Sequence, residues 1–419
     1  MIDLVLLASG CVTFIVATLV CNTFKNPWNI VFVIWFPLLY LSSLSLTGLT
    51  PPSVVTKLLF FFSLLSMFFG FISCGNKHSS FFIVDINSKV VFNISLVGLV
   101  IIFVPLVVTL KIIYQSGYLE FLALTRWSGG DRSNAFGSKF IYSIVNYFFI
   151  PIAYACFFLA ISKFLLSKEK DYLIKLNLFL ACLMLLTHAF LLTSRIELLV
   201  VVSAMLMGAF LTSNLTKKII LPLVLIATLA VLLSINRIGQ EGILMNIFKV
   251  FVIDYHTVSF SMFDNSYLNK ESFFYSYDTF GLTTFSIINF PIERISSFIY
   301  SFRDVGVDTL VIKEMSQSVS VGFSDGVELK YNSFYSGLAP LFIDFSYFMF
   351  IPLFLFGFII RYLYNSFKVM RSEYFLALLL FCLYTIYVSL FFPPFIKQSY
   401  WISFLIIFTL PLISKVKVK

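Results

Sequence analysis

Charged residues are scarce in this sequence: Asp, Glu, Lys and Arg make up only 12% of the 419 residues, whereas about a quarter is usual in soluble domains. Apolar residues make up 60% of the chain, and the mean hydropathy is +0.98. A water-soluble fold could not bury that much apolar surface. The composition therefore excludes an ordinary soluble domain and predicts an all-α polytopic membrane protein.

Patterns that bind metals or form disulfides are also lacking. The three histidines are dispersed, and no two of the six cysteines form a C-x-x-C pair. The cysteines lie within or at the ends of apolar runs, which is typical of small buried hydrophobic residues. We therefore expect no metal site and no cofactor.

The net charge of +9 does not come from one basic module. Lys and Arg occur singly or in pairs between apolar runs, which argues against a nucleic-acid partner and is typical of charges that orient a membrane protein. The N-terminus lacks the basic stretch and the cleavage site of a secretory signal, so we interpret its apolar run as a first permanent span.

About eleven apolar runs approach the length of about 20 residues that a helix needs to cross the hydrocarbon layer. They are 4–20, 28–46, 58–74, 90–110, 140–161, 176–192, 198–211, 219–235, 338–360, 374–392 and 400–412. Lys and Arg accumulate after every second run, beginning with the first. Because cytoplasmic loops hold the excess of these residues, we predict an external N-terminus and a cytoplasmic C-terminus.

This layout predicts three regions. Residues 1–235 hold transmembrane helices 1–8 with an external basic loop near 111–139, residues 236–339 form one large external loop, and residues 340–419 hold transmembrane helices 9–11. A loop as long as 236–339 usually has a function or a fold of its own. Within it, residues 242–253 and 285–300 have apolar positions near helical spacing, which predicts helices along the membrane surface.

Arginines at the outer face are candidates for an anion site, because a guanidinium can bind a phosphate through two hydrogen bonds. Arg195 lies in a short turn between two predicted spans, where a topological charge paired with Glu197 is the alternative interpretation. Arg126 and Arg132 flank glycines in the 111–139 loop, and both a phosphate site and an ordinary flexible loop fit that pattern.

The large loop adds further candidates. Arg237 and Arg294 contribute positive charge, and the sequence Asp254-Tyr255-His256 offers two groups that could accept a proton from a hydroxyl. A structural hydrogen-bonding role is the alternative for both Asp254 and His256.

The layout resembles that of the bacterial O-antigen polymerases, the Wzy-type oligosaccharide repeat unit polymerases. Arg195 with Leu199 matches their Arg-x-x-x-Leu turn, and Arg126 with Gly137 matches the arginine, about ten residues, then glycine pattern of some members. A second motif of that kind is missing from the large loop.

The end of the large loop adds to this resemblance. Tyr331-Asn332-Ser333, followed by Asp344-Phe345 before an apolar run, is similar to the end of the large loop in these polymerases.

The resemblance implies a membrane glycosyltransferase at the periplasmic face of the bacterial inner (cytoplasmic) membrane, acting without a metal. It would join undecaprenyl diphosphate-linked oligosaccharides, as donor and acceptor, into O-antigen or a related surface polysaccharide. The resemblance leaves open whether a chain-length regulator protein binds as a partner. The residues that would bind the diphosphates are Arg126, Arg132, Arg195, Arg237 and Arg294. Asp254 or His256 would be the base.

Two other functions fit the same layout. A flippase for lipid-linked oligosaccharides, or another transporter, would also be multi-span, and Pro37, Pro105 and Pro151 interrupt predicted spans. Transporters usually place their polar groups at the bilayer midplane, whereas this chain has them at the outer face. An O-antigen ligase shares both the architecture and the arginines.

Overall fold

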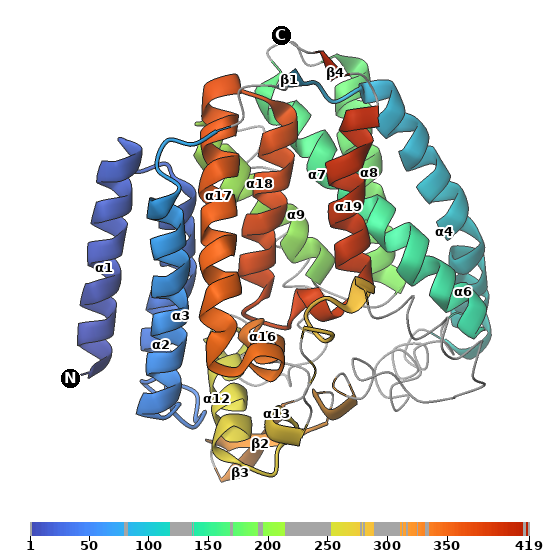
Figure 1. Cartoon of the computed structure of the whole chain (residues 1–419). Helices are drawn as coiled ribbons and strands as arrows, with labels where there is room; N and C mark the ends of the chain where they lie inside the picture. The colour runs from blue at the N-terminus through green and yellow to red at the C-terminus, as the bar shows by residue number, and fades with distance from the viewer. Residues whose placement is uncertain are drawn as a thin grey trace. The chain divides into compact units, whose positions relative to one another are not determined.

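The structure, a computed structural model, describes residues 2–78, 83–117, 136, 138–167, 171–191, 196–213, 253–276, 279, 281–288, 311, 313–315, 317–324, 326–331, 335–413 and 416–417. It is predominantly helical (Figure 1). The longer helices are α1 (Ile2–Cys21), α2 (Pro27–Leu41), α3 (Val54–Ser73), α4 (Ser88–Ser116), α7 (Ile150–Leu166), α8 (Tyr172–Leu191), α9 (Ile196–Thr212), α12 (Tyr255–Leu268), α17 (Phe350–Met370), α18 (Glu373–Val388) and α19 (Gln398–Ile413).

Shorter elements complete the described chain. The short helices are α6 (Lys139–Ile144), the π-helical segment η2 (Val145–Phe149), α13 (Phe273–Ser276), α16 (Leu338–Phe345) and the 3-10 segments η4 (Ser346–Met349) and η5 (Pro394–Ile396). Strands β1 (Ile83–Val84) and β4 (Val416–Lys417) form one antiparallel pair, and strands β2 (Val319–Ser324) and β3 (Val327–Tyr331) form another. Neither pair was predicted.

The apolar helices account for most of the predicted spans. Within the described residues, six helical stretches are long and apolar enough to cross a membrane, and α2, α9, α18 and α19 are shorter apolar helices. Every predicted run overlaps one of these helices except 219–235, which lies outside the described residues. The chain is therefore a multi-pass α-helical membrane protein.

The predicted span at 338–360 lies within one apolar helical stretch, Leu338–Met370, and ends too early. The chain breaks at Ser346, which adopts a positive φ of 47° between α16 and η4, and α17 then continues past 360 to Met370. The apolar run missed this extension because Arg361 and Asn365 interrupt it. Both side chains are buried inside unit 1, defined below, where backbone carbonyl oxygens accept their hydrogen bonds.

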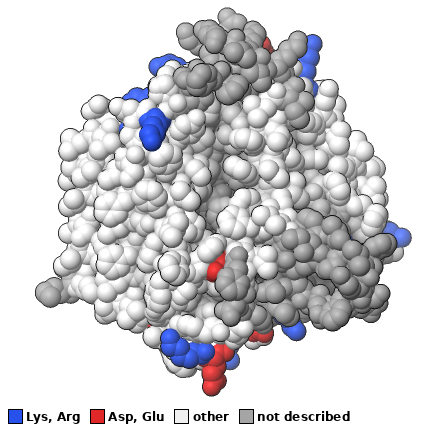
Figure 2. Space-filling view, viewed as in Figure 1, with Lys and Arg blue, Asp and Glu red and all other residues white. Residues whose placement is uncertain are grey.

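Helix α4 shows how the apolar surface is used. Its buried positions include Ser95, Gly98 and Thr109, whereas Val100 and Phe103 are 73% and 63% exposed. A helix in water has the opposite arrangement, with its large apolar side chains buried. The face shown in Figure 2 is accordingly dominated by uncharged residues. This pattern indicates that the exposed face of α4 contacts lipid.

The chain divides into two units. Unit 1 comprises 1–77, 231–365 and 382–398, and unit 2 comprises 78–230, 366–381 and 399–419. In unit 1, the start of α1 and the start of α3 meet where Asp3 and Lys57 form an ion pair of 2.9 Å. Helix α12, from the large loop, reaches the same end of α3 through Asp264. The start of α1 and helix α12 of the large loop therefore lie at the same end of unit 1.

In unit 2, several connections that alternate along the chain also lie together at one end. β1, which lies before α4, pairs with β4 near the C-terminus. Lys163 at the end of α7 forms an ion pair of 3.2 Å with Glu373 at the start of α18, and Asn177 of α8 donates to the Ser88 carbonyl oxygen at the start of α4. The connections that the charge pattern assigns to the cytoplasm are therefore neighbours in this unit.

Helices α3 and α17 pack through glycines in unit 1. A Cβ added at Gly70 would lie 1.8 Å from the carbonyl oxygen of Phe354, and one at Gly357 would lie 1.9 Å from that of Met67. Ser66 also donates to the Phe350 carbonyl oxygen at 2.6 Å. Small residues that let two backbones approach this closely are characteristic of helix packing in membranes.

We expect Gly357→Ala to lower the stability of unit 1, because the new methyl group has no space beside the Met67 carbonyl. Overpacking of this kind costs about 1–3 kcal/mol, which is measurable as a lower thermal unfolding midpoint in detergent. Gly98→Ala in α4 is the control, since its Cβ would meet side chains and no backbone: the flexible end of Met184 at 2.7 Å and the Cγ2 of Ile152 at 3.1 Å. Equal midpoints for the two variants would contradict the close packing of α3 and α17.

Candidate functional site

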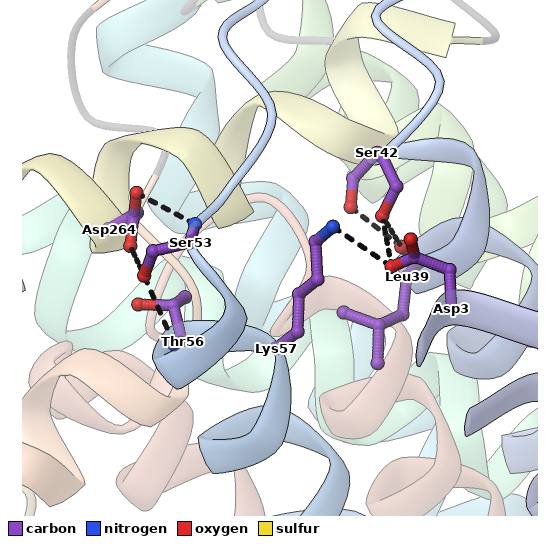
Figure 3. A network of polar contacts seen from close by, with 8 residues as sticks. Asp3, Leu39, Ser42, Ser53, Thr56, Lys57 and Asp264 are labelled. Carbon is purple, nitrogen blue, oxygen red and sulfur yellow. Dashed lines mark hydrogen bonds and ion pairs between the residues drawn. The ribbon is translucent and has the colours of Figure 1, made fainter. Parts of the chain in front are cut away.

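The described part of the large loop is fixed to the connection between α2 and α3. Ser53 caps α3 by accepting from the Thr56 backbone N–H, and Asp264 of α12 accepts from both the backbone N–H and the hydroxyl of Ser53 at 3.0 and 2.5 Å (Figure 3). Ser261, one turn earlier in α12, donates to the Thr50 carbonyl oxygen at 2.7 Å. One carboxylate thus fixes the loop to the start of a membrane helix.

The β2–β3 hairpin contacts the same connection. Leu49 forms a bridge with Gly322, and the Thr50 N–H donates to the Val321 carbonyl oxygen at 2.7 Å. Gly322 has a φ of +150°, and a Cβ there would lie 2.2 Å from the Gly48 carbonyl oxygen. Only glycine suits this position, because any side chain would separate the hairpin from residues 48–50.

Asp254 lies immediately before α12 and is 4% exposed. Its Oδ2 accepts a hydrogen bond of 3.0 Å from the Tyr331 hydroxyl at the end of β3. Burial, together with the neighbouring carboxylate, raises the pKa of Tyr331, so the phenol stays protonated and keeps donating. The carboxylate predicted as a base therefore also holds the hairpin to α12.

His256 lies in the first turn of α12 and is partly buried. The imidazole and the aromatic ring of Phe391 form a T-shaped pair with centroids 4.9 Å apart, and the centroid of the Tyr387 ring lies 6.3 Å away. Unit 1 therefore brings both predicted base candidates to the same end of α12, with aromatic rings around the imidazole.

Asp344 of α16 holds another part of the large loop in place. It accepts hydrogen bonds from the Thr279 hydroxyl, from the Thr283 N–H at 3.2 Å and from the Thr284 N–H at 2.5 Å. Three donors on one buried carboxylate fix residues 279–284 against α16. Two residues on which the family resemblance rests, Tyr331 and Asp344, thus each hold loop elements together.

All five predicted diphosphate-binding residues lie outside the described residues: Arg126, Arg132, Arg195, Arg237 and Arg294. The same holds for most of the two predicted surface helices at 242–253 and 285–300. Their roles stay predictions.

Sequence reasoning missed a buried pair in unit 2. His188, in the last turn of α8, and Glu197, in the first turn of α9, are 3% and 5% exposed, and the imidazole Nδ1 lies 2.8 Å from Glu197 Oε1. The alternative interpretation of Arg195, a charge paired with Glu197, stays a prediction because Arg195 lies outside the described residues. The signal that could have revealed the pair is two titratable residues on either side of one short turn.

Comparisons of the chain with models of protein families, with curated proteins and with solved structures find no match.

Proposed function

We propose that this chain polymerises undecaprenyl diphosphate-linked oligosaccharide repeat units into O-antigen or a related surface polysaccharide. The observation that carries the proposal is the attachment of the large loop to the start of the membrane helix α3 through Asp264, while Asp344 and Asp254 hold further elements of the loop together. A folded region fixed at the membrane surface suits a reaction in which both substrates are held by lipid anchors and only their headgroups and sugars reach the enzyme.

The proposed location is the bacterial inner (cytoplasmic) membrane, with the large loop in the periplasm. This sidedness rests on the basic residues in alternate loops. Contacts within each unit support this grouping of the connections. In unit 1, the start of α1 and helix α12, both assigned to the outside, reach the start of α3. In unit 2, Lys163 pairs with Glu373, and both residues lie at connections that the charge pattern assigns to the cytoplasm.

The chemistry makes two demands on the protein. The departing lipid diphosphate needs charge stabilisation, which we assign to Arg126, Arg132, Arg195, Arg237 and Arg294. The attacking sugar hydroxyl must lose a proton to a base as the anomeric carbon develops oxocarbenium character. Asp254 and His256 are the bases that the sequence offers for this step.

Deleting the gene in its native host tests the proposal. We expect surface polysaccharide that carries a single repeat unit, and we expect long chains to return when the wild-type chain is supplied again. Long chains that persist in the deletion strain would overturn the proposal. A deletion that removes even the single unit would instead indicate a flippase or a ligase.

A further inference from the structure

The proposed function gives no role to the His188–Glu197 pair of unit 2. Both side chains are buried at the ends of two apolar helices, α8 and α9. Ionisable groups in membrane helices are costly, and they are retained mainly where they bind ligands or move protons. The pair therefore needs an explanation beyond helix packing.

The geometry of the pair leaves Nε2 for a ligand. Nδ1 lies 2.8 Å from Glu197 Oε1, an ion-pair distance for a protonated imidazole, but the contact does not have hydrogen-bond geometry. Both ring nitrogens are buried, and among the described residues Nε2 has no polar contact. A buried acceptor atom without a partner is destabilising unless a bound molecule supplies a donor.

The surroundings of the imidazole also indicate a functional site. The ring of Phe149, the last residue of the π-helical segment η2, lies with its centroid 6.3 Å from that of His188. π-Helical turns inside α-helices occur frequently at functional sites. In the sequence, Glu197 follows Arg195 by two residues, so the pair adjoins the turn that carries a predicted diphosphate ligand.

We propose that His188 Nε2 is the base that accepts the proton from the acceptor sugar hydroxyl, and that Glu197 positions it. The assignment rests on the proposed function. The O–H bond of the acceptor breaks, its proton moves to Nε2, and the oxygen bonds to the anomeric carbon of the donor chain. The bond from that carbon to the diphosphate breaks, and its electron pair leaves with the lipid diphosphate. Glu197 then faces an imidazolium, which its negative charge stabilises.

This assignment gives Asp254 and His256 other roles. Asp254 accepts the hydrogen bond of Tyr331 and joins α12 to β3, and His256 packs against Phe391. His188 is distinguished by a carboxylate 2.8 Å from Nδ1 and by an Nε2 that has no polar contact among the described residues.

The test uses the full-length chain purified in lipid nanodiscs. Its substrate is the lipid-linked oligosaccharide extracted from host cells that lack the gene, and product length is followed by gel and mass spectrometry. We expect His188→Gln to lower turnover by about 10²–10⁴-fold, the usual contribution of a general base. Glu197→Gln should lower kcat by about 10–100-fold with KM unchanged, as expected for the loss of a positioning carboxylate.

Glu373→Gln is the matched control, because it makes the same change at another partly buried glutamate of unit 2, one that contacts Lys163. It should leave turnover near that of the wild type. Unfolding midpoints measured on every variant separate loss of chemistry from loss of fold. If His188→Gln does not accumulate, the kcat and KM of Glu197→Gln decide the question.

The proposal is overturned if folded His188→Gln matches the wild type, or if Glu197→Gln behaves as Glu373→Gln does. It is also overturned if Asp254→Asn or His256→Gln, rather than His188→Gln, abolishes turnover in folded protein. In those cases wild-type activity still supports the polymerase. If the wild-type chain itself forms no longer product, the proposed function fails as well.

Discussion

Cells whose only copy of the chain carries Arg195→Ala are expected to display polysaccharide with a single repeat unit. Alanine removes a guanidinium that we assign to the departing diphosphate, and losing one such donor costs about 10²–10³-fold in rate. The chain should reach the membrane in normal amounts, because the substitution leaves the apolar helices on either side unchanged. The measurement is the length distribution of the polysaccharide on a gel, with protein level determined in parallel.

Arg371→Ala is the control for this experiment. Arg371 is an exposed arginine in the connection between α17 and α18, which the charge pattern assigns to the cytoplasm. Its loss should leave the long chains intact. Unchanged long chains in the Arg195→Ala cells would remove Arg195 from the site.

The second large effect is expected on stability. Asp344→Ala would leave the Thr279 hydroxyl and the N–H groups of Thr283 and Thr284 without their buried acceptor. Each buried donor left unsatisfied costs about 1–3 kcal/mol. We therefore expect a large decrease in the thermal unfolding midpoint in detergent, together with loss of polymer.

Asp344→Asn should also destabilise the protein, though less than alanine. Its amide oxygen can replace Oδ1, but its NH₂ group would face the Thr284 N–H, which needs an acceptor. Glu271→Ala, an exposed carboxylate of the same loop, is the control and should leave the midpoint unchanged. A midpoint of Asp344→Ala equal to that of this control would show that residues 279–284 are held by other contacts.

Hydropathy located the membrane helices because lipid imposes a simple rule on them. A spanning helix must be long, apolar and internally hydrogen bonded, so runs such as 4–20 and 58–74 found α1 and α3 with small errors at the ends. The rule failed where polar side chains are satisfied inside the protein. Arg361 ended the predicted span early, yet α17 continues because carbonyl oxygens and the rings of Phe71 and Tyr364 surround the guanidinium.

The fold of the large loop escaped prediction for a different reason. Helix α12 is buried at apolar and polar positions alike, including Phe260, Ser261 and Asp264, so it shows no apolar stripe facing one side. The hairpin had a usable signal, the Asp325-Gly326 dipeptide between alternating apolar residues, which is typical of a tight hairpin turn. The contacts that fix both elements are long-range: Asp264 and Ser53 are 211 positions apart.

The candidate site was predictable only in part. Residue types identified Asp254 and His256 as titratable groups near the membrane surface, but not the Tyr331 hydroxyl that binds the carboxylate. In the sequence, His188 was considered only as one of three dispersed histidines that suggest no metal site. Its meaning depends on Glu197, which is brought to it by the packing of α8 against α9.

Reconstitution of the purified chain with lipid-linked single repeat units is the most direct measurement of the activity. If the chain is a polymerase, it should convert these units into a ladder of longer lipid-linked products and release lipid diphosphate, with no nucleotide sugar or other protein added. Translocation of intact single units across the vesicle membrane, with no ladder, would contradict the polymerase and favour a transporter.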